Sequence, residues 1–148
     1  MGKRRNFGTG INMDVTMAIA ASGMAAALTS LTASASHIAN VETIGPAPSG
    51  GQPAPSNSGS VYQAISASPA ALPGGGVATV VSGTLPGYAL AYDPSAPFAN
   101  LQGMVAAPNV DPVAETVKQI SASAAFRANL AVFEAADRNA KSLLDSLA

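Results

Sequence analysis

The sequence contains no cysteine and no tryptophan, and it has few charged and few aromatic residues. Without cysteine the chain forms no disulfides and offers no thiolate metal ligands, which is compatible with either redox compartment. Charged residues make up 10% of the 148 residues and the formal net charge is −1, so the balance favours neither nucleic acid nor an anionic membrane. Much of the 48% hydrophobic content is alanine, which predicts a thin core.

Groups that carry chemistry are also scarce. His37 is the only histidine, and we interpret it as a polar residue on a helix. Asp111 and Glu115 are one helical turn apart, and we interpret them as a cap and a favourable charge at a helix N-terminus rather than a metal or acid–base pair. Gly74-Gly75-Gly76 lacks the following Lys and Ser/Thr of a phosphate loop, and Lys3-Arg4-Arg5 is a weak basic patch in a leader. We therefore expect a protein that is not an enzyme, with no cofactor, no metal, no nucleic acid and no small-molecule substrate.

The charges that are present divide the chain unevenly. Between Asp14 and Asp93 the only formal charge is Glu42, and residues 45–60 have the Pro/Gly-rich composition of a linker. We predict four segments: 1–14 as a flexible leader, 15–42 as an N-terminal assembly helix, 43–110 as a Pro/Gly-rich middle with short strands, and 111–148 as a C-terminal assembly helix.

Short strand-like runs occur in the middle segment. They are VYQAI (61–65), VATVVS (77–82) and YALAY (88–92), each bounded by Gly or Pro. Residues 83–87, GTLPG, join the last two runs and predict a β-hairpin between them.

The C-terminal helix has a clear start. Asp111 is typical of an N-cap and Pro112 of the first helical position, where the missing N–H costs nothing. From Val113 to about Leu147 no Pro or Gly occurs, which predicts one long helix. The predicted fold class is therefore mainly α with a small β element, in which long terminal helices pack as a coiled coil.

Both terminal segments carry apolar residues at helical spacing. On the N-terminal helix a 4-3 heptad pattern gives a stripe of Met17, Ala21, Met24, Leu28, Leu31, Ala35 and Ile38. The C-terminal stripes are Val113, Val117, Ile120 and Ala124, and then, with Asp137 interrupting, Phe126, Leu130, Phe133, Ala140, Leu144 and Leu147. Full burial of the N-terminal stripe gives roughly 10 kcal/mol, whereas ordering each residue costs about 1–2 kcal/mol. That helix therefore needs a partner, which is either the C-terminal helix or a neighbouring chain.

The N-terminal segment also has the parts of a secretory signal. A basic run, an apolar segment and Ala33-Ser34-Ala35 stand in the expected order. Asp14 directly before the apolar run counts against it, and so does the stripe that continues past Ala35 to Ile38. A membrane span is less favoured, because Ser and Thr recur and large aliphatic residues are sparse. The alternative function is thus a secreted or periplasmic binding module with a cleaved signal peptide.

Several segments resemble a known family. Residues 21–40, ASGMAAALTSLTASASHIAN, are similar to the N-terminal motif of flagellar rod, hook and hook-associated proteins. YDPSAP (92–97), PNVDPVAE (108–115) and SASAAFRAN (121–129) resemble the proximal-rod proteins of the flagellar basal body. The sequence departs from the family pattern at three positions, with His37 in place of Asn, Ala124 in place of Arg and Phe126 in place of Tyr.

The resemblance implies a structural subunit of the proximal rod, located in the periplasmic part of the flagellar basal body. It implies export through the flagellar type III apparatus without cleavage, followed by stacking of the terminal helices into a tube. Expected partners are other rod subunits, copies of the chain itself, and the MS ring at the base of the rod. The expected assembly interface consists of Met17, Ala21, Met24, Leu28, Leu31, Ala35, Ile38, Asn40, Val113, Val117, Ile120, Phe126, Asn129, Leu130, Phe133 and Leu144.

Overall fold

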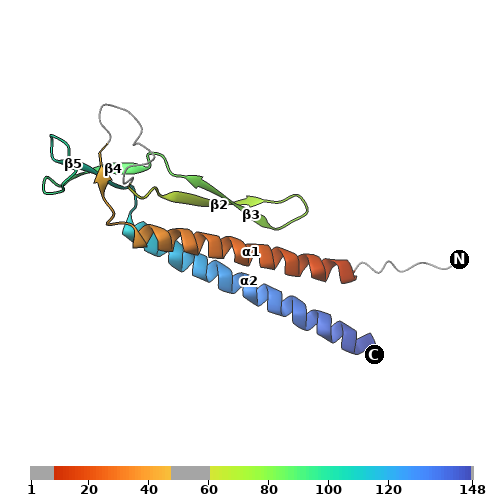
Figure 1. The fold of residues 1–148 in the computed structure, drawn as a ribbon. Coiled ribbons are helices and arrows are strands. Elements are labelled where there is room, and N and C mark those ends of the chain that lie inside the picture. Colours follow the sequence, from red (N-terminus) through yellow and green to blue (C-terminus); the bar gives the residue numbers. More distant parts are fainter. Residues whose placement is uncertain (1–8, 48–60, 148) are drawn as a thin grey trace.

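Two long helices run side by side, with the strands gathered over and beyond one end of the pair (Figure 1). The structure is a computed structural model, and it describes residues 9–47 and 61–147. The helices are α1 (Thr9–Ala39) and α2 (Pro112–Leu147). The strands are β1 (Gly45–Pro46), β2 (Ile65–Ala71), β3 (Val77–Gly83), β4 (Tyr88–Tyr92) and β5 (Met104–Pro108). The predicted class, mainly α with a small β element, is confirmed.

The predicted start of the C-terminal helix is also confirmed. The carboxylate oxygen Oδ1 of Asp111 accepts hydrogen bonds from the backbone N–H groups of Val113, at 2.9 Å, and Ala114, at 3.3 Å. These bonds satisfy donors that have no partner inside the helix. Pro112 occupies the first helical position and fits there because its φ is already suitable.

Helix α1 is longer at its N-terminus than expected. It begins at Thr9, so residues 9–14 are helical rather than part of a flexible leader. No proline occurs between Thr9 and Ala39, and the helix continues without a breaker until the turn that follows Ala39. Residues 1–8 of the predicted leader and residues 48–60 of the predicted linker lie outside the described residues.

The predicted hairpin between 77–82 and 88–92 is wrong. Strand β3 pairs instead with β2 in an antiparallel two-stranded sheet, with Ile65 opposite Gly83 and Ala71 opposite Val77. Strand β4 belongs to a separate sheet. The run 61–65 was also misplaced, because the strand begins only at Ile65 and continues through Pro69 to Ala71.

The glycine triplet explains this choice of partner. Gly74, Gly75 and Gly76 all have positive φ angles, of 98°, 99° and 86°. Only glycine adopts this region without steric cost, so the triplet closes a tight connection between β2 and β3. Gly83 and Gly87, in the other Gly/Pro-rich segment, do not appear among the positive-φ glycines. The triplet thus serves as the chain reversal between β2 and β3, a role that the sequence analysis did not assign to it.

The second sheet contains a strand that the sequence analysis missed. Its order is β1-β5-β4, and β5 is the central strand, antiparallel to both neighbours. Val105 on β5 is fully buried and Ala106 is 1% exposed, so this sheet has a small core of its own. The Pro-rich sequence around β5 concealed it, although Pro108 stands only at the end of the strand.

The helix pair packs through small side chains. Among the helix residues whose side chains the structure describes, the buried apolar ones are alanines, namely Ala20, Ala27, Ala33, Ala122 and Ala136. Gly23 lies directly against Asn129 of α2, and a Cβ at this position would overlap the Asn129 side chain. Apart from Ala33, the interior face of α1 therefore consists of Ala20, Gly23, Ala27, Ser30, Ser34 and His37. This face precedes the predicted stripe by one residue at each step. Coiled-coil packing in the strict sense stays a prediction.

Candidate assembly surface and buried polar cluster

Three polar side chains are buried where the C-terminal end of α1 meets the N-terminal end of α2. Ser34, His37 and Glu115 are 2%, 4% and 4% exposed. The Ser34 hydroxyl donates to Oε2 of Glu115 at 2.6 Å, and the His37 Nδ1 atom lies 3.1 Å from the same oxygen. Lys118 Nζ, whose side chain is largely exposed, donates to Oε1 of Glu115 at 2.7 Å. The carboxylate thus has partners on both oxygens.

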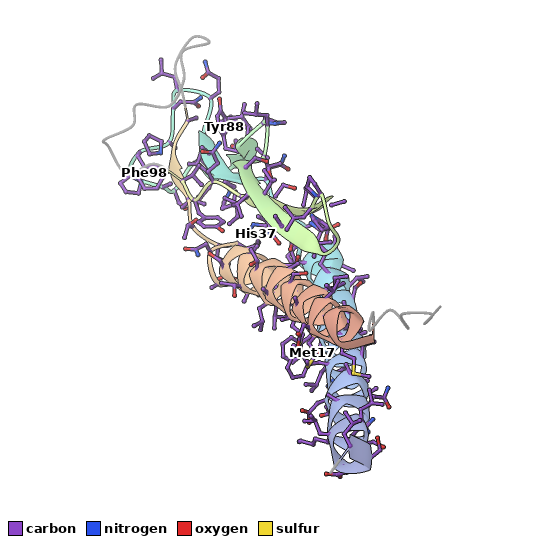
Figure 2. All side chains as sticks on the ribbon, turned by 90° about the vertical axis from the view of Figure 1, so that its right-hand side faces the viewer. Met17, His37, Tyr88 and Phe98 are labelled. Atoms are coloured by element: carbon purple, nitrogen blue, oxygen red, sulfur yellow. The ribbon has the colours of Figure 1, made fainter. Side chains whose placement is uncertain are left out.

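His37 also connects the helix pair to the first strand of the hairpin. Its Nε2 atom accepts a hydrogen bond from the backbone N–H of Ile65 at 3.1 Å. In a neutral imidazole with Nε2 as acceptor, the proton is on Nδ1 and faces Glu115. The Nδ1–Oε2 contact is close but is not aligned as a hydrogen bond, so its contribution is mainly electrostatic. Figure 2 shows His37 between α1 and the strands.

The surroundings of Glu115 set its protonation state. Burial raises the pKa of the Glu115 carboxyl, but hydrogen bonds from Lys118 and Ser34, together with the nearby His37, outweigh it, so the pKa lies below its ordinary value of 4.5. Glu115 is therefore ionised at neutral pH. It lies in the first turn of α2, where a negative charge also interacts favourably with the helix dipole.

The cluster does not have the geometry of a nucleophile–base pair. In such a pair the hydroxyl donates to the imidazole, whereas the Ser34 hydroxyl donates to the carboxylate. The Nε2 atom of His37 is occupied by the N–H of Ile65 and is not free to take a proton from a substrate. Among the described residues no group of three or more His, Cys, Asp and Glu side chains could hold a metal ion.

Sequence analysis missed this cluster. It treated His37 as a polar helix residue and Glu115 as a charge at a helix terminus, whereas both are buried and in contact. The two residues are far apart in the sequence, and no local pattern indicates that the end of one helix meets the start of the other. The available signal was the spacing of Ser34 and His37, which places both on one face of α1.

The β2–β3 hairpin lies along α1 and is held at a second point. The Ser22 hydroxyl accepts from the backbone N–H of Val77 at 3.1 Å and donates to the carbonyl of Ile19 at 2.7 Å. A Cβ at Gly76 would lie 2.7 Å from the Ser22 hydroxyl oxygen, so glycine is needed for this close approach. The hairpin, α1 and α2 together enclose a groove of about 670 Å³, lined mainly by small side chains.

The predicted interface residues all lie on or near the surface of the single chain. Half-buried ones are Met17, Met24, Leu31, Ile38, Asn40, Phe126, Asn129 and Phe133. Exposed ones are Ala21, Leu28, Ala35, Val113, Val117, Ile120, Leu130 and Leu144. None belongs to the buried core, and Asn129 lies directly against Gly23 of the other helix.

Large apolar side chains on the helices are uncovered to an unusual degree. Leu28 is 49% exposed, Val117 61%, Ile120 66% and Leu144 67%. An isolated exposed leucine is ordinary, but rows of exposed aliphatic residues along both helices are typical of a surface that takes part in an interaction.

The apolar sequence of α1 raises the question of whether this helix spans a membrane. Residues Met13–Ala39 are long and apolar enough to cross a membrane by length and composition, and little of this segment is buried within the chain. Such a segment near an N-terminus is weak evidence by itself. In the structure, α1 contributes Ser34 and His37 to a polar cluster with Glu115, which is the packing of a paired helix rather than a lipid-facing one.

Comparisons with known proteins agree with an assembly role. The family described as flagellar basal body rod FlgEFG protein C-terminal matches residues 101–146. The flagellar basal-body rod protein FlgC of Salmonella typhimurium is 36% identical over 115 residues, which cover 77% of this chain and 82% of the relative. The proteins of the same name from Aquifex aeolicus and Bacillus subtilis are 45% and 42% identical over 49 and 48 residues, about a third of each chain.

The first of these relatives is aligned over most of both chains, so the similarity is not confined to one motif. The matched family segment begins before β5 and extends along nearly all of α2. It thereby includes Glu115 and the exposed stripe at Val113, Val117 and Ile120. The chain therefore belongs to the FlgC family of flagellar basal-body rod proteins and is a structural subunit of that rod.

Proposed function

We propose that the chain assembles with copies of itself and with other rod subunits through the outward faces of α1 and α2, forming the wall of the proximal rod. The observation that carries this proposal is the exposure of the aliphatic rows, with Leu28 49% and Ile120 66% exposed in the single chain. Burying such side chains contributes about 1.5–3 kcal/mol each, which is sufficient to drive association when several meet.

The helix pair is suited to this task by its shape. Both helices reach the same end of the molecule, away from the strands, and their outer faces are free of the hairpin (Figure 1). In this arrangement the terminal helices of 15–42 and 111–148 form the tube, and the middle segment 43–110 lies outside it and contacts neighbouring subunits. The MS ring at the base of the rod and the flagellar type III export apparatus are the further partners that this role requires.

Retention of the N-terminal segment is part of the same proposal. The triplet Ala33-Ser34-Ala35, which resembles a signal-peptidase site, lies inside α1, and Ser34 is bound to Glu115. Cleavage there would remove Ala20, Ala27 and the other interior residues that pack against α2. The secreted binding module with a cleaved signal is accordingly not favoured.

Leu28→Asp tests the assembly face. Leu28 is half exposed, so an aspartate there leaves the fold of the single chain intact but introduces a charge into the proposed contact. We expect the variant to be exported normally and to be missing from purified basal bodies, with motility lost. Leu28→Met is the matched control, because it keeps an apolar side chain of similar size at the same position and should assemble. Normal rods from Leu28→Asp would show that this face is not an assembly contact.

A further inference from the structure

The interior of the helix pair repeats every seven residues and consists almost entirely of small side chains. On α1 the repeat is Ala20, Ala27 and Ser34, and on α2 it is Glu115, Ala122, Asn129 and Ala136. Large knobs in complementary holes normally fix the register of two helices, and small side chains do so weakly. If α2 moved along α1 by one heptad, alanines would again face alanines.

The buried polar cluster responds differently to such a movement. Ser34, His37 and Glu115 are the polar side chains among the buried residues that the structure describes. A shift of one heptad would leave the Glu115 carboxylate without the Ser34 hydroxyl and without His37, inside an apolar contact. Lys118 is on the same helix and would stay bound to Oε1, but Oε2 would lose the donor that it has in the native register. Because a buried carboxylate oxygen without a donor is unfavourable, the native register satisfies this group better than the displaced one.

We propose that Ser34, His37 and Glu115 form a register lock, which selects one axial alignment of α1 and α2, and that His37 extends this alignment to the β2–β3 hairpin through Ile65. The three residues are positioning residues: they determine where the outward apolar rows of the two helices lie relative to each other and to the hairpin. The inference concerns the packing of one chain, so its failure would leave the proposed assembly role untouched.

The absence of cysteine makes the register directly measurable. A Cβ built at Gly23 lies 2.6 Å from Cγ of Asn129, which places the two Cβ atoms within reach of a disulfide, for which the Cβ separation is about 3.5–4.5 Å. The double variant Gly23→Cys, Asn129→Cys therefore reports the native register in the full-length chain. The triple variant Gly23→Cys, Ala122→Cys, Asn129→Ala reports a register displaced by one heptad, in the direction that places Glu115 opposite Ala27. The Asn129→Ala substitution removes the side chain that a Cβ at Gly23 would overlap in the native register.

The lock is removed in a background of Ser34→Ala, His37→Leu and Glu115→Leu. Replacing a buried ionic cluster with apolar residues commonly leaves stability unchanged or higher, so helicity measured by circular dichroism should be retained. In the parent chain we expect a disulfide to form in the native pair and not in the displaced pair. In the lock-free chain we expect the yield of the disulfide in the displaced pair to increase at least threefold. Exclusive native cross-linking without the lock would overturn the proposal, and so would loss of helicity with no displaced product.

Two single substitutions separate the contacts of His37. Glutamine places its amide where Nε2 lies, whereas asparagine reaches only as far as Nδ1. We expect His37→Gln to preserve slow hydrogen exchange at the Ile65 amide. We expect His37→Asn to accelerate that exchange at least tenfold while the native cross-link persists. Equal protection of Ile65 in both variants would refute the connection to the hairpin, because the bond to Nε2 is the contact that only glutamine can replace.

Discussion

At the scale of single residues, the charge of Glu115 is the most consequential feature of the fold. The Glu115 carboxylate accepts hydrogen bonds from the Ser34 hydroxyl and the Lys118 ammonium, and His37 lies close to it. The residue is almost inaccessible to solvent. Each of these groups is ordinary by itself. Their convergence at the junction of two helices and a strand makes a directional polar contact between α1 and α2.

Acid should weaken this junction. Because the pKa of Glu115 is lower in the folded chain than the ordinary 4.5, its stabilising contribution is complete above that value and is lost as the pH falls through the folded pKa. We expect the melting temperature, followed by circular dichroism, to decrease progressively below pH 4.5. The variant Glu115→Gln should have a lower melting temperature at pH 7 and a shallower decrease in acid. An identical decrease in both proteins would assign the acid effect to other carboxyl groups.

Prediction from the sequence succeeded at this scale where the evidence was local. Asp111 was identified as a cap because a cap depends on neighbouring residues only, and both of its hydrogen bonds are present. Glu115, four residues later, was understood only as a favourable charge. Its burial depends on α1 lying across it, and that is a property of the tertiary structure.

At the scale of elements, the heptad spacing of apolar residues along the helices was predictable from the sequence. The face of each helix that packs inside the chain was not. The apolar stripe beginning at Met17 has a correct heptad spacing, yet the interior face is one residue earlier and contains Ala, Gly, Ser and His. Hydrophobic patterning favours the larger side chains as the inner face. In this helix pair the backbones approach closely, so the smaller side chains of α1 form the inner face. The larger side chains face outward and are available for contacts with other chains.

Gly23 makes this close approach possible. Leucine has a higher helix propensity than glycine by about 0.8 kcal/mol, but at Gly23 it would overlap Asn129 and separate the helices, at a cost of about 1–3 kcal/mol. We expect Gly23→Leu to lower the free energy of unfolding by about 1–2 kcal/mol, measured by denaturant titration. The control Ala21→Leu, at an exposed position of the same helix, should not destabilise the chain. A Gly23→Leu protein as stable as the parent would indicate that the helices do not pack here.

The pairing of the strands was predicted wrongly from the sequence. Gly/Pro-rich segments occur both at 72–76 and at 83–87, and the prediction placed the turn at the second of them. The hairpin forms at the first, where three successive glycines adopt positive φ and the turn rests against Ser22 and Ile19 of α1. The glycine triplet is the local signal for this turn, and the contact with α1, which no local propensity contains, stabilises it further.

At the scale of the whole molecule, the chain has a small interior and extensive uncovered apolar surface. Its core consists of alanines between the helices and a few residues around Val105, while the aliphatic rows of α1 and α2 remain exposed. This imbalance is what the composition predicted, with abundant alanine and few aromatic residues. It is the design expected of a subunit whose stability is completed by its neighbours in the rod.

A density map of the assembled basal body at side-chain resolution tests this account most directly. It should show α1 continuous through residues 33–35, with Leu28, Val117 and Ile120 covered by adjacent subunits and the strands outside the tube of helices. A map in which these side chains face solvent, or in which the chain begins after residue 35, would contradict the account.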